Sequence, residues 1–198
     1  MTLSTIIIIA PILSFSVISI AIIIERFLFL KNQSVNVDKY KSFLPVNFIG
    51  LKEYCLQNKN SLFNSMLLSL FSSSFLSKAE MDEYLDSNFT NIYLNMQKRV
   101  SYLGIFAKLS TLLGLFGTVI GMISAFNNIV AKGISNASIV ASGISTALIT
   151  TAVGLAVAIP STFFHDFFQH KIENEIKKME IIVSEIVAAY IKKRKGEQ

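Results

Sequence analysis

Three long stretches without a charged residue constrain the fold of this chain more than any other feature. The first runs from Met1 to Ile24, the second lies between Lys108 and Lys132, and the third lies between Lys132 and Asp166. A helix rises 1.5 Å per residue, so about 20 mainly apolar residues cross roughly 30 Å of hydrocarbon. The sequence therefore predicts an all-α integral membrane protein with three transmembrane helices. Their expected cores lie near residues 4–25, 109–130 and 139–160.

The composition agrees with a chain that lies largely in a bilayer. Hydrophobic residues make up 52% of the sequence and charged residues 16%, and the mean hydropathy is +0.54. A soluble fold rarely combines these values. The first stretch could instead be a cleaved signal peptide, but no basic residue precedes it and Glu25-Arg26 follow it. We therefore expect a retained anchor, with the pair Glu25 and Arg26 at the membrane edge.

The distribution of Lys and Arg predicts the orientation in the membrane. Ten of these residues occur from Arg26 to Lys108 and seven follow Asp166, whereas the turn after the second span holds only Lys132. By the positive-inside rule, residues 31–100 and the C-terminus are cytoplasmic and the N-terminus is periplasmic. The net charge of +5 follows from this topology, so we expect no nucleic-acid partner. The single Cys55 excludes an internal disulfide, and we expect a reduced, unreactive thiol.

Apolar stripes at helical spacing extend the second and third spans into the cytoplasm. One stripe comprises Met81, Leu85, Phe89, Ile92, Met96, Val100 and Leu103, and the other comprises Phe164, Phe168, Ile172, Ile176, Met179, Val183, Ile186 and Tyr190. Mixed acids and bases between these positions favour antiparallel packing of the two helices in a cytoplasmic bundle over binding flat on the bilayer. We expect a first transmembrane helix at 1–30, a cytoplasmic linker with short helices at 31–77, a long helix with the second span at 78–131, a periplasmic turn at 132–137, and the third span with a C-terminal cytoplasmic helix at 138–195.

No pattern typical of an enzyme occurs in the sequence. His165 and His170 lie five residues apart, but no Cys or further His nearby completes a metal-ligand set. The sequence contains no P-loop and no G-x-S-x-G motif. We therefore expect a protein that is not an enzyme and has no cofactor or metal.

Small and hydroxylated residues interrupt the second and third spans. In lipid, small residues allow helix backbones to approach closely, so we assign Gly114, Gly117, Gly121, Gly143 and Gly154 to helix packing at a pore. Hydroxyls at mid-depth can bond a carbonyl of their own helix or face a water-filled path. Composition favours an ion-path lining over packing for Thr118, Ser145, Thr146, Thr150 and Thr151.

Two long motifs resemble one family of membrane proteins. Leu112-Leu-Gly-Leu-Phe-Gly-Thr-Val-Ile-Gly121, followed by Ala125-Phe126, resembles the second-span signature of the MotA/TolQ/ExbB proton channel family. The stretch GISTALITTAVGLAVAIP at 143–160 is similar to the third, and Glu25-Arg26 fits the TolQ/ExbB branch. The four-span flagellar branch is less similar, because this chain has three spans.

The resemblance implies an inner-membrane pentamer around a central pore. The pore would hold single-span partners of the ExbD/TolR type, which supply an intramembrane aspartate, and a TonB/TolA-like protein could join them. Proton flow would then drive TonB-dependent uptake or Tol-Pal type work at the outer membrane or in the periplasm. Thr118 and Thr151 would lie beside the partner's aspartate, with membrane lipids outside.

Thr146 departs from the family pattern, because well-studied TolQ and ExbB proteins have glutamate there. A threonine cannot exchange a proton at physiological pH. The shuttling carboxylate is therefore expected from the partner alone. The chief alternative is a passive membrane scaffold that organises envelope or division proteins, and a transporter permease is a third reading.

Overall fold

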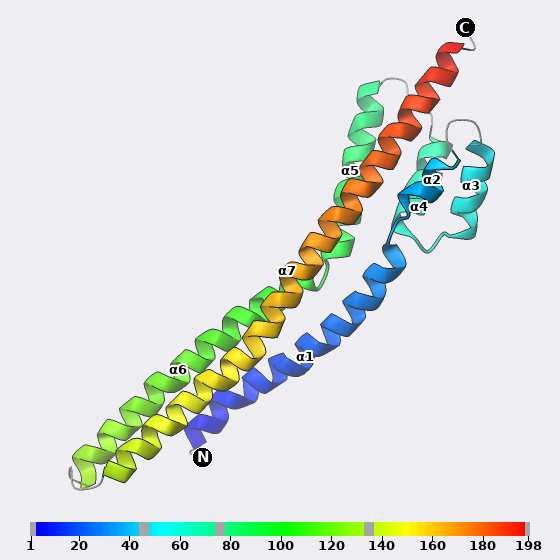
Figure 1. Cartoon of the computed structure of the whole chain (residues 1–198). Helices are drawn as coiled ribbons and strands as arrows, with labels where there is room; N and C mark the ends of the chain where they lie inside the picture. Colours follow the sequence, from blue (N-terminus) through cyan, green and yellow to red (C-terminus); the bar gives the residue numbers. More distant parts are fainter. Residues whose placement is uncertain (1–2, 44–47, 74–77, 133–136, 197–198) are drawn as a thin grey trace. The chain divides into compact units, whose positions relative to one another are not determined.

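The computed structural model describes residues 3–43, 48–73, 78–132 and 137–196, which form α-helices and no strand (Figure 1). Three helical segments are long and apolar enough to cross a membrane: Ile6–Lys41, Val100–Val130 and Ala141–Ala189. The predicted all-α class with three membrane-spanning helices is therefore confirmed. Most of the predicted turn at 132–137 lies outside the described residues.

The described helices are α1 (Leu3–Gln33), α2 (Val37–Lys41), α3 (Phe48–Gln57), α4 (Leu62–Ser72), α5 (Lys78–Gln97), α6 (Val100–Lys132) and α7 (Ala137–Gly196). They divide into two compact units. The first unit, which we call the span unit, comprises Met1–Arg26 and Arg99–Phe168. The second unit comprises Phe27–Lys98 and Gln169–Gln198.

In the span unit, α1 packs against the antiparallel pair formed by α6 and the first half of α7. Ile8 and Ile12 of α1 form a buried cluster with Val157 of α7, and the surrounding partly buried residues are Leu113, Ile120 and Val153. Phe15 stacks on Phe106 with ring centroids 5.1 Å apart. On the outer faces, large apolar side chains such as Val17, Leu112 and Phe126 remain exposed. Outer faces of this kind suit lipid or another protein chain.

In the second unit, polar side chains fix the loops that follow α1. The amide of Gln33 donates to the carbonyl of Asn60 at 3.1 Å and accepts from the N–H of Leu62 at 2.9 Å. The buried carboxylate of Glu175 on α7 accepts from the N–H of Val35 at 2.8 Å. Lys178 pairs with the same carboxylate at 2.8 Å, so this buried charge has the partners that its desolvation requires.

The chain interrupts the long helix predicted at 78–131. α5 ends at Gln97 and α6 begins at Val100, with Arg99 at a φ of 71°. This left-handed conformation costs a non-glycine residue roughly 1–2 kcal/mol. An ion pair between Arg99 Nη1 and Glu25 Oε1 at 3.2 Å offsets part of that cost, contributing less than about 1 kcal/mol because both groups are solvent-accessible. The structure thus differs from the predicted single helix at this point.

α7 continues through Pro160 without a break and extends for 60 residues. Its predicted apolar stripe is buried from Phe168 to Ile186. Proline removes one backbone hydrogen bond inside a helix. The hydrogen bonds of the other turns keep the helix intact, so the predicted third span and the predicted C-terminal helix form one element.

The buried thiol of Cys55 provides a test of packing in the second unit. Cys55 on α3 is fully buried, and burial raises its pKa to about 11. Only the thiolate is nucleophilic, so we expect negligible alkylation at pH 8 in the native chain. The rate of labelling should rise about tenfold per pH unit toward pH 11. Denaturant should expose the thiol and make labelling fast even at pH 8. An exposed cysteine introduced as Ser87→Cys in a Cys55→Ser chain is the control, and equal native rates for the two would contradict the burial.

Candidate functional site

A row of glycines brings the backbones of α6 and α7 into close contact. A Cβ at Gly154 would lie 2.5 Å from the carbonyl oxygen of Ser110, and one at Gly121 would lie 2.5 Å from Cβ of Ala147. A Cβ at Gly143 would lie 2.6 Å from that of Ala125. Real Cβ atoms do not approach so closely, so these positions require glycine for the observed helix separation. The structure therefore uses the glycines for packing within one chain.

Thr150 and Thr151 reach across this contact to one carbonyl group. The hydroxyl of Thr151 donates to Gly114 O at 3.0 Å, and that of Thr150 lies 3.3 Å from the same oxygen. Thr150 also bonds Ala147 O at 2.6 Å and is only 2% exposed. A Cβ at Gly117 would collide with the Thr150 side chain. Thr150 is thus fully engaged between the two helices, whereas Thr151 is partly exposed.

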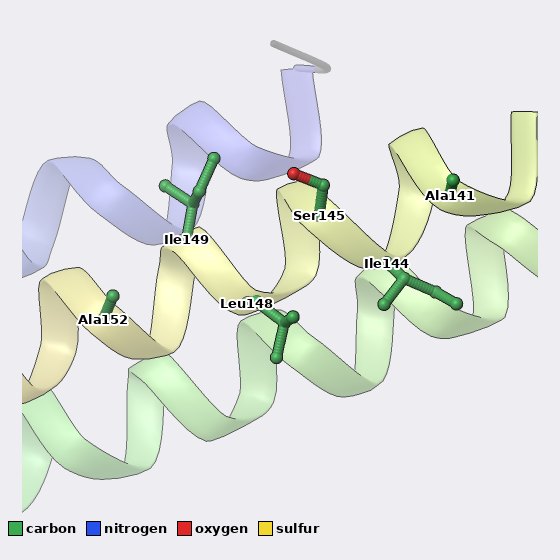
Figure 2. A pocket seen from close by; sticks show the side chains of 6 residues that line it. All are labelled: Ala141, Ile144, Ser145, Leu148, Ile149 and Ala152. Atoms are coloured by element: carbon green, nitrogen blue, oxygen red, sulfur yellow. The ribbon is translucent and has the colours of Figure 1, made fainter. Parts of the chain in front are cut away.

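The other three hydroxyls lie apart from this contact. Thr118 donates to Leu115 O at 2.6 Å and Thr146 to Ser142 O at 2.9 Å, each within its own helix. Ser145 is exposed on an outer face of α7, in a shallow open groove (Figure 2). It is the only polar side chain of that groove, which is otherwise lined by Ala141, Ile144, Leu148, Ile149 and Ala152.

Helix geometry assigns the threonines to two flanks of the α6–α7 pair. Successive residues of a helix are separated by about 100°, and Leu113 and Val153 mark the flank that packs on α1. Thr118 lies about 140° around α6 from Leu113, and Thr151 about 160° around α7 from Val153. Both therefore turn toward the flank away from α1. Thr146, about 20° from Val153, lies on the α1 flank.

Sequence reasoning did not identify a further close contact at Gly104. A Cβ there would lie 3.1 Å from the ring of His165, whose Nδ1 lies 2.9 Å from the carboxylate of Asp166. Gly104 lies outside the family-like motif, and nothing in the sequence indicated this contact. Another unforeseen residue is Ser110, whose hydroxyl is fully buried without a hydrogen-bond partner in the described part of the chain.

The membrane-edge pair forms a three-residue cluster. Arg26 binds both carboxylate oxygens of Glu25 at 2.8 Å, and Arg99 adds the contact at 3.2 Å described above. Arg26 is 4% exposed, whereas the side chain of Arg99 is 53% exposed. The sequence indicates the Glu25–Arg26 pair, but the third member comes from a residue 73 positions after Arg26.

The threonines can bind and orient hydrogen-bonding groups but cannot take up a proton. No Asp or Glu occurs from Val100 to His165. Among the residues described, no group of three or more His, Cys, Asp and Glu could hold a metal ion. On the flank away from α1, Thr118 and Thr151 therefore form an uncharged polar strip with no titrating group of its own.

A tightly packed pair of long apolar helices with hydroxyls along their contact is typical of multi-helix membrane proteins. Residues 58–181, more than half of the chain, match the model of the MotA/TolQ/ExbB proton channel family. The chain belongs to this family and is a membrane protein. No curated protein sequence matches it.

The fold is similar to that of a solved structure of C. jejuni MotAB. The TM-score is 0.64 at 17% sequence identity, and the match covers 96% of this chain and 78% of that one. At this identity the likeness concerns the fold alone.

The close contact of α6 and α7 can be tested with paired substitutions. We expect Gly154→Ala to lower the free energy of unfolding by about 1–3 kcal/mol, because the new Cβ meets backbone atoms that cannot move independently. Gly104→Ala is the matched control, since its Cβ meets the movable His165 ring at 3.1 Å and alanine favours the helix. Denaturant titration in detergent, followed by circular dichroism, gives both values, and equal losses would contradict the close contact.

Proposed function

We propose that this chain is the ExbB/TolQ-like subunit of an inner-membrane complex in which proton flow drives work at the outer membrane or in the periplasm. Family membership supports ion-driven function. The observation that carries the proposal further is the uncharged strip: hydroxyls lie at mid-span and no acid accompanies them. The partner is a single-span protein of the ExbD/TolR type that supplies an intramembrane aspartate.

We assign the partner helix to the flank of the α6–α7 pair that faces away from α1. α1 already covers the flank of Leu113 and Val153, so a further helix finds Thr118 and Thr151 on the opposite side. Thr151 retains partial exposure while it bonds Gly114 O. A carboxylic acid arriving there can exchange hydrogen bonds with both hydroxyls. We leave Thr150 out of this lining, because its hydroxyl is buried and bonded between α6 and α7.

Assembly and orientation follow the family pattern in this proposal. Copies of the chain form a pentamer around the partner helices, with apolar outer faces toward lipid. The Lys and Arg distribution supports an orientation with the N-terminus in the periplasm and the C-terminus in the cytoplasm. The work served is TonB-dependent uptake or the Tol-Pal type, in which a TonB/TolA-like protein also takes part.

The first test compares the purified chain with its complex in liposomes. The probe is a pH-sensitive dye inside vesicles that carry a potassium diffusion potential. We expect proton uptake with the complex and only background leakage with the chain alone, because the chain lacks a titrating group in its spans. Proton flux from the chain alone at the rate of the complex would contradict the missing-acid hypothesis. A complex with no flux at all would support the scaffold alternative.

The second test concerns the hydroxyl of Thr118. We expect Thr118→Ala to reduce proton flux through the complex roughly tenfold, since one hydrogen bond to a charged group contributes about 1.5–3 kcal/mol. Thr118→Ser keeps the hydroxyl and should retain most of the flux. Thr146→Ala is the control on the other flank and should also retain it. Loss of the oligomer in Thr118→Ala, seen by size-exclusion chromatography, would favour a packing role.

A further inference from the structure

We propose that His165 and Asp166 form a proton-exchange site at the cytoplasmic end of the path, and that the flank away from α1 leads to it. The site takes up and releases protons between bulk water and the strip of Thr118 and Thr151. The inference rests on the proposed function, because the strip carries protons only when a partner supplies the acid. All the residues involved belong to the span unit.

Two further hydroxyls, which we call the linking hydroxyls, continue along this flank beyond the strip. Thr111 lies about 160° around α6 from Leu113, and Thr162 lies about 180° around α7 from Val153, so both turn away from α1. Both side chains are exposed. Thr111 donates to Ala107 O at 3.0 Å, whereas the hydroxyl of Thr162 has no hydrogen-bond partner in the described part of the chain. A hydroxyl of this kind can bond water.

The contacts between α6 and α7 set the order of these groups along the pair. Gly154 lies opposite the carbonyl of Ser110, and Gly104 lies opposite the ring of His165. The linking hydroxyls therefore occupy successive levels between the strip and this ring. At 1.5 Å per residue no step exceeds about 12 Å along the axis, which a few hydrogen-bonded waters can bridge. Lys108 is exposed on the same stretch of α6, and charged side chains near the end of a span reach toward water.

The two ring nitrogens of His165 have different surroundings. Nδ1 lies 2.9 Å from Oδ1 of Asp166. A carboxylate only accepts hydrogen bonds, so Nδ1 of the neutral ring carries the hydrogen and Nε2 is the nitrogen that can accept a proton. Nε2 lies beside Gly104, where even a Cβ would come within 3.1 Å of it. Glycine at this position keeps α6 from covering Nε2 with a side chain.

The chemistry of the pair suits proton exchange. His165 is the first titratable side chain of α7, and imidazole takes up and releases a proton near neutral pH, which a hydroxyl does not. A proton that arrives through water binds Nε2, and the carboxylate of Asp166 stabilises the imidazolium that results. The imidazolium then gives one proton to bulk water and returns to the neutral ring. The side chains of His165 and Asp166 are 24% and 62% exposed, so bulk water reaches the pair.

Substitution of His165 by glutamine and by glutamate separates proton exchange from packing. The measurement is proton flux through the complete complex in liposomes that contain the pH-sensitive dye. A positioned proton-transfer group contributes roughly a hundredfold, and water replaces it in part at an exposed site, so we expect His165→Gln to lower the flux about tenfold. Glutamate has the shape of glutamine but can titrate, so His165→Glu should retain more of the flux. His170→Gln is the control and should change nothing, since His170 lies about 140° around α7 from His165.

Asp166→Asn gives a second variant that leaves the fold intact, because this side chain is 62% exposed. We expect a several-fold loss of flux, since the imidazolium loses its counter-charge. Parent flux in both His165→Gln and Asp166→Asn would overturn the exchange site and leave the proposed function standing. Equal, reduced flux in His165→Gln and His165→Glu would assign His165 to packing and overturn the exchange site as well. A parent complex without flux would contradict both proposals.

Discussion

The close approach of the α6 and α7 backbones is the constraint on which the span unit depends. At Gly154 the carbonyl of Ser110 occupies the space that a Cβ would need, so even one methyl group would separate the helices. In lipid no hydrophobic drive holds helices together, and dispersion over such a contact replaces it. The same approach brings the hydroxyls of Thr150 and Thr151 within reach of Gly114 O. The helix packing and the hydrogen bonds of these two threonines thus arise from one contact.

This contact also limits what the chain can do alone. Its polar atoms in the spans are hydroxyls and backbone carbonyls, which orient protons or water but do not store charge. A carboxylate in hydrocarbon is costly unless protein or water surrounds it. A chain without such a group pays no such cost while it assembles, and in the proposed complex the acid enters only with the partner. Membership of a proton channel family is therefore compatible with the absence of an acidic residue from α6 and the first half of α7.

The sequence predicted the helices well because charge and apolar spacing act over many residues. Three charge-free stretches indicated the spans, and the stripe from Phe168 to Ile186 is buried as its spacing requires. The sequence also predicted that the glycines of the spans pack helices together, because small residues let helix backbones approach closely in lipid. It did not predict which helices they bring together, because composition cannot distinguish contact within a chain from contact around a pore.

Two other features could not be read from the sequence. The left-handed backbone of Arg99 contradicts the local helix preference, and the ion pair of Arg99 with Glu25 joins residues 74 positions apart in the chain. The division of the threonines between two flanks depends on where α1 packs. Only the cluster of Ile8, Ile12 and Val157 settles that point.

The surroundings of Thr146 show what a glutamate at this position would require. Its hydroxyl donates to Ser142 O in its own helix. Thr146 lies on the same flank as Val153 and Val157, which pack against α1 further along α7. A side chain that satisfies itself can remain at a helix surface in lipid without a partner. A glutamate at this position would need water or a counter-charge on the α1 flank, away from Thr118 and Thr151. Threonine removes that requirement, so in the proposed complex a single flank carries the ion path and the other is free to serve packing alone.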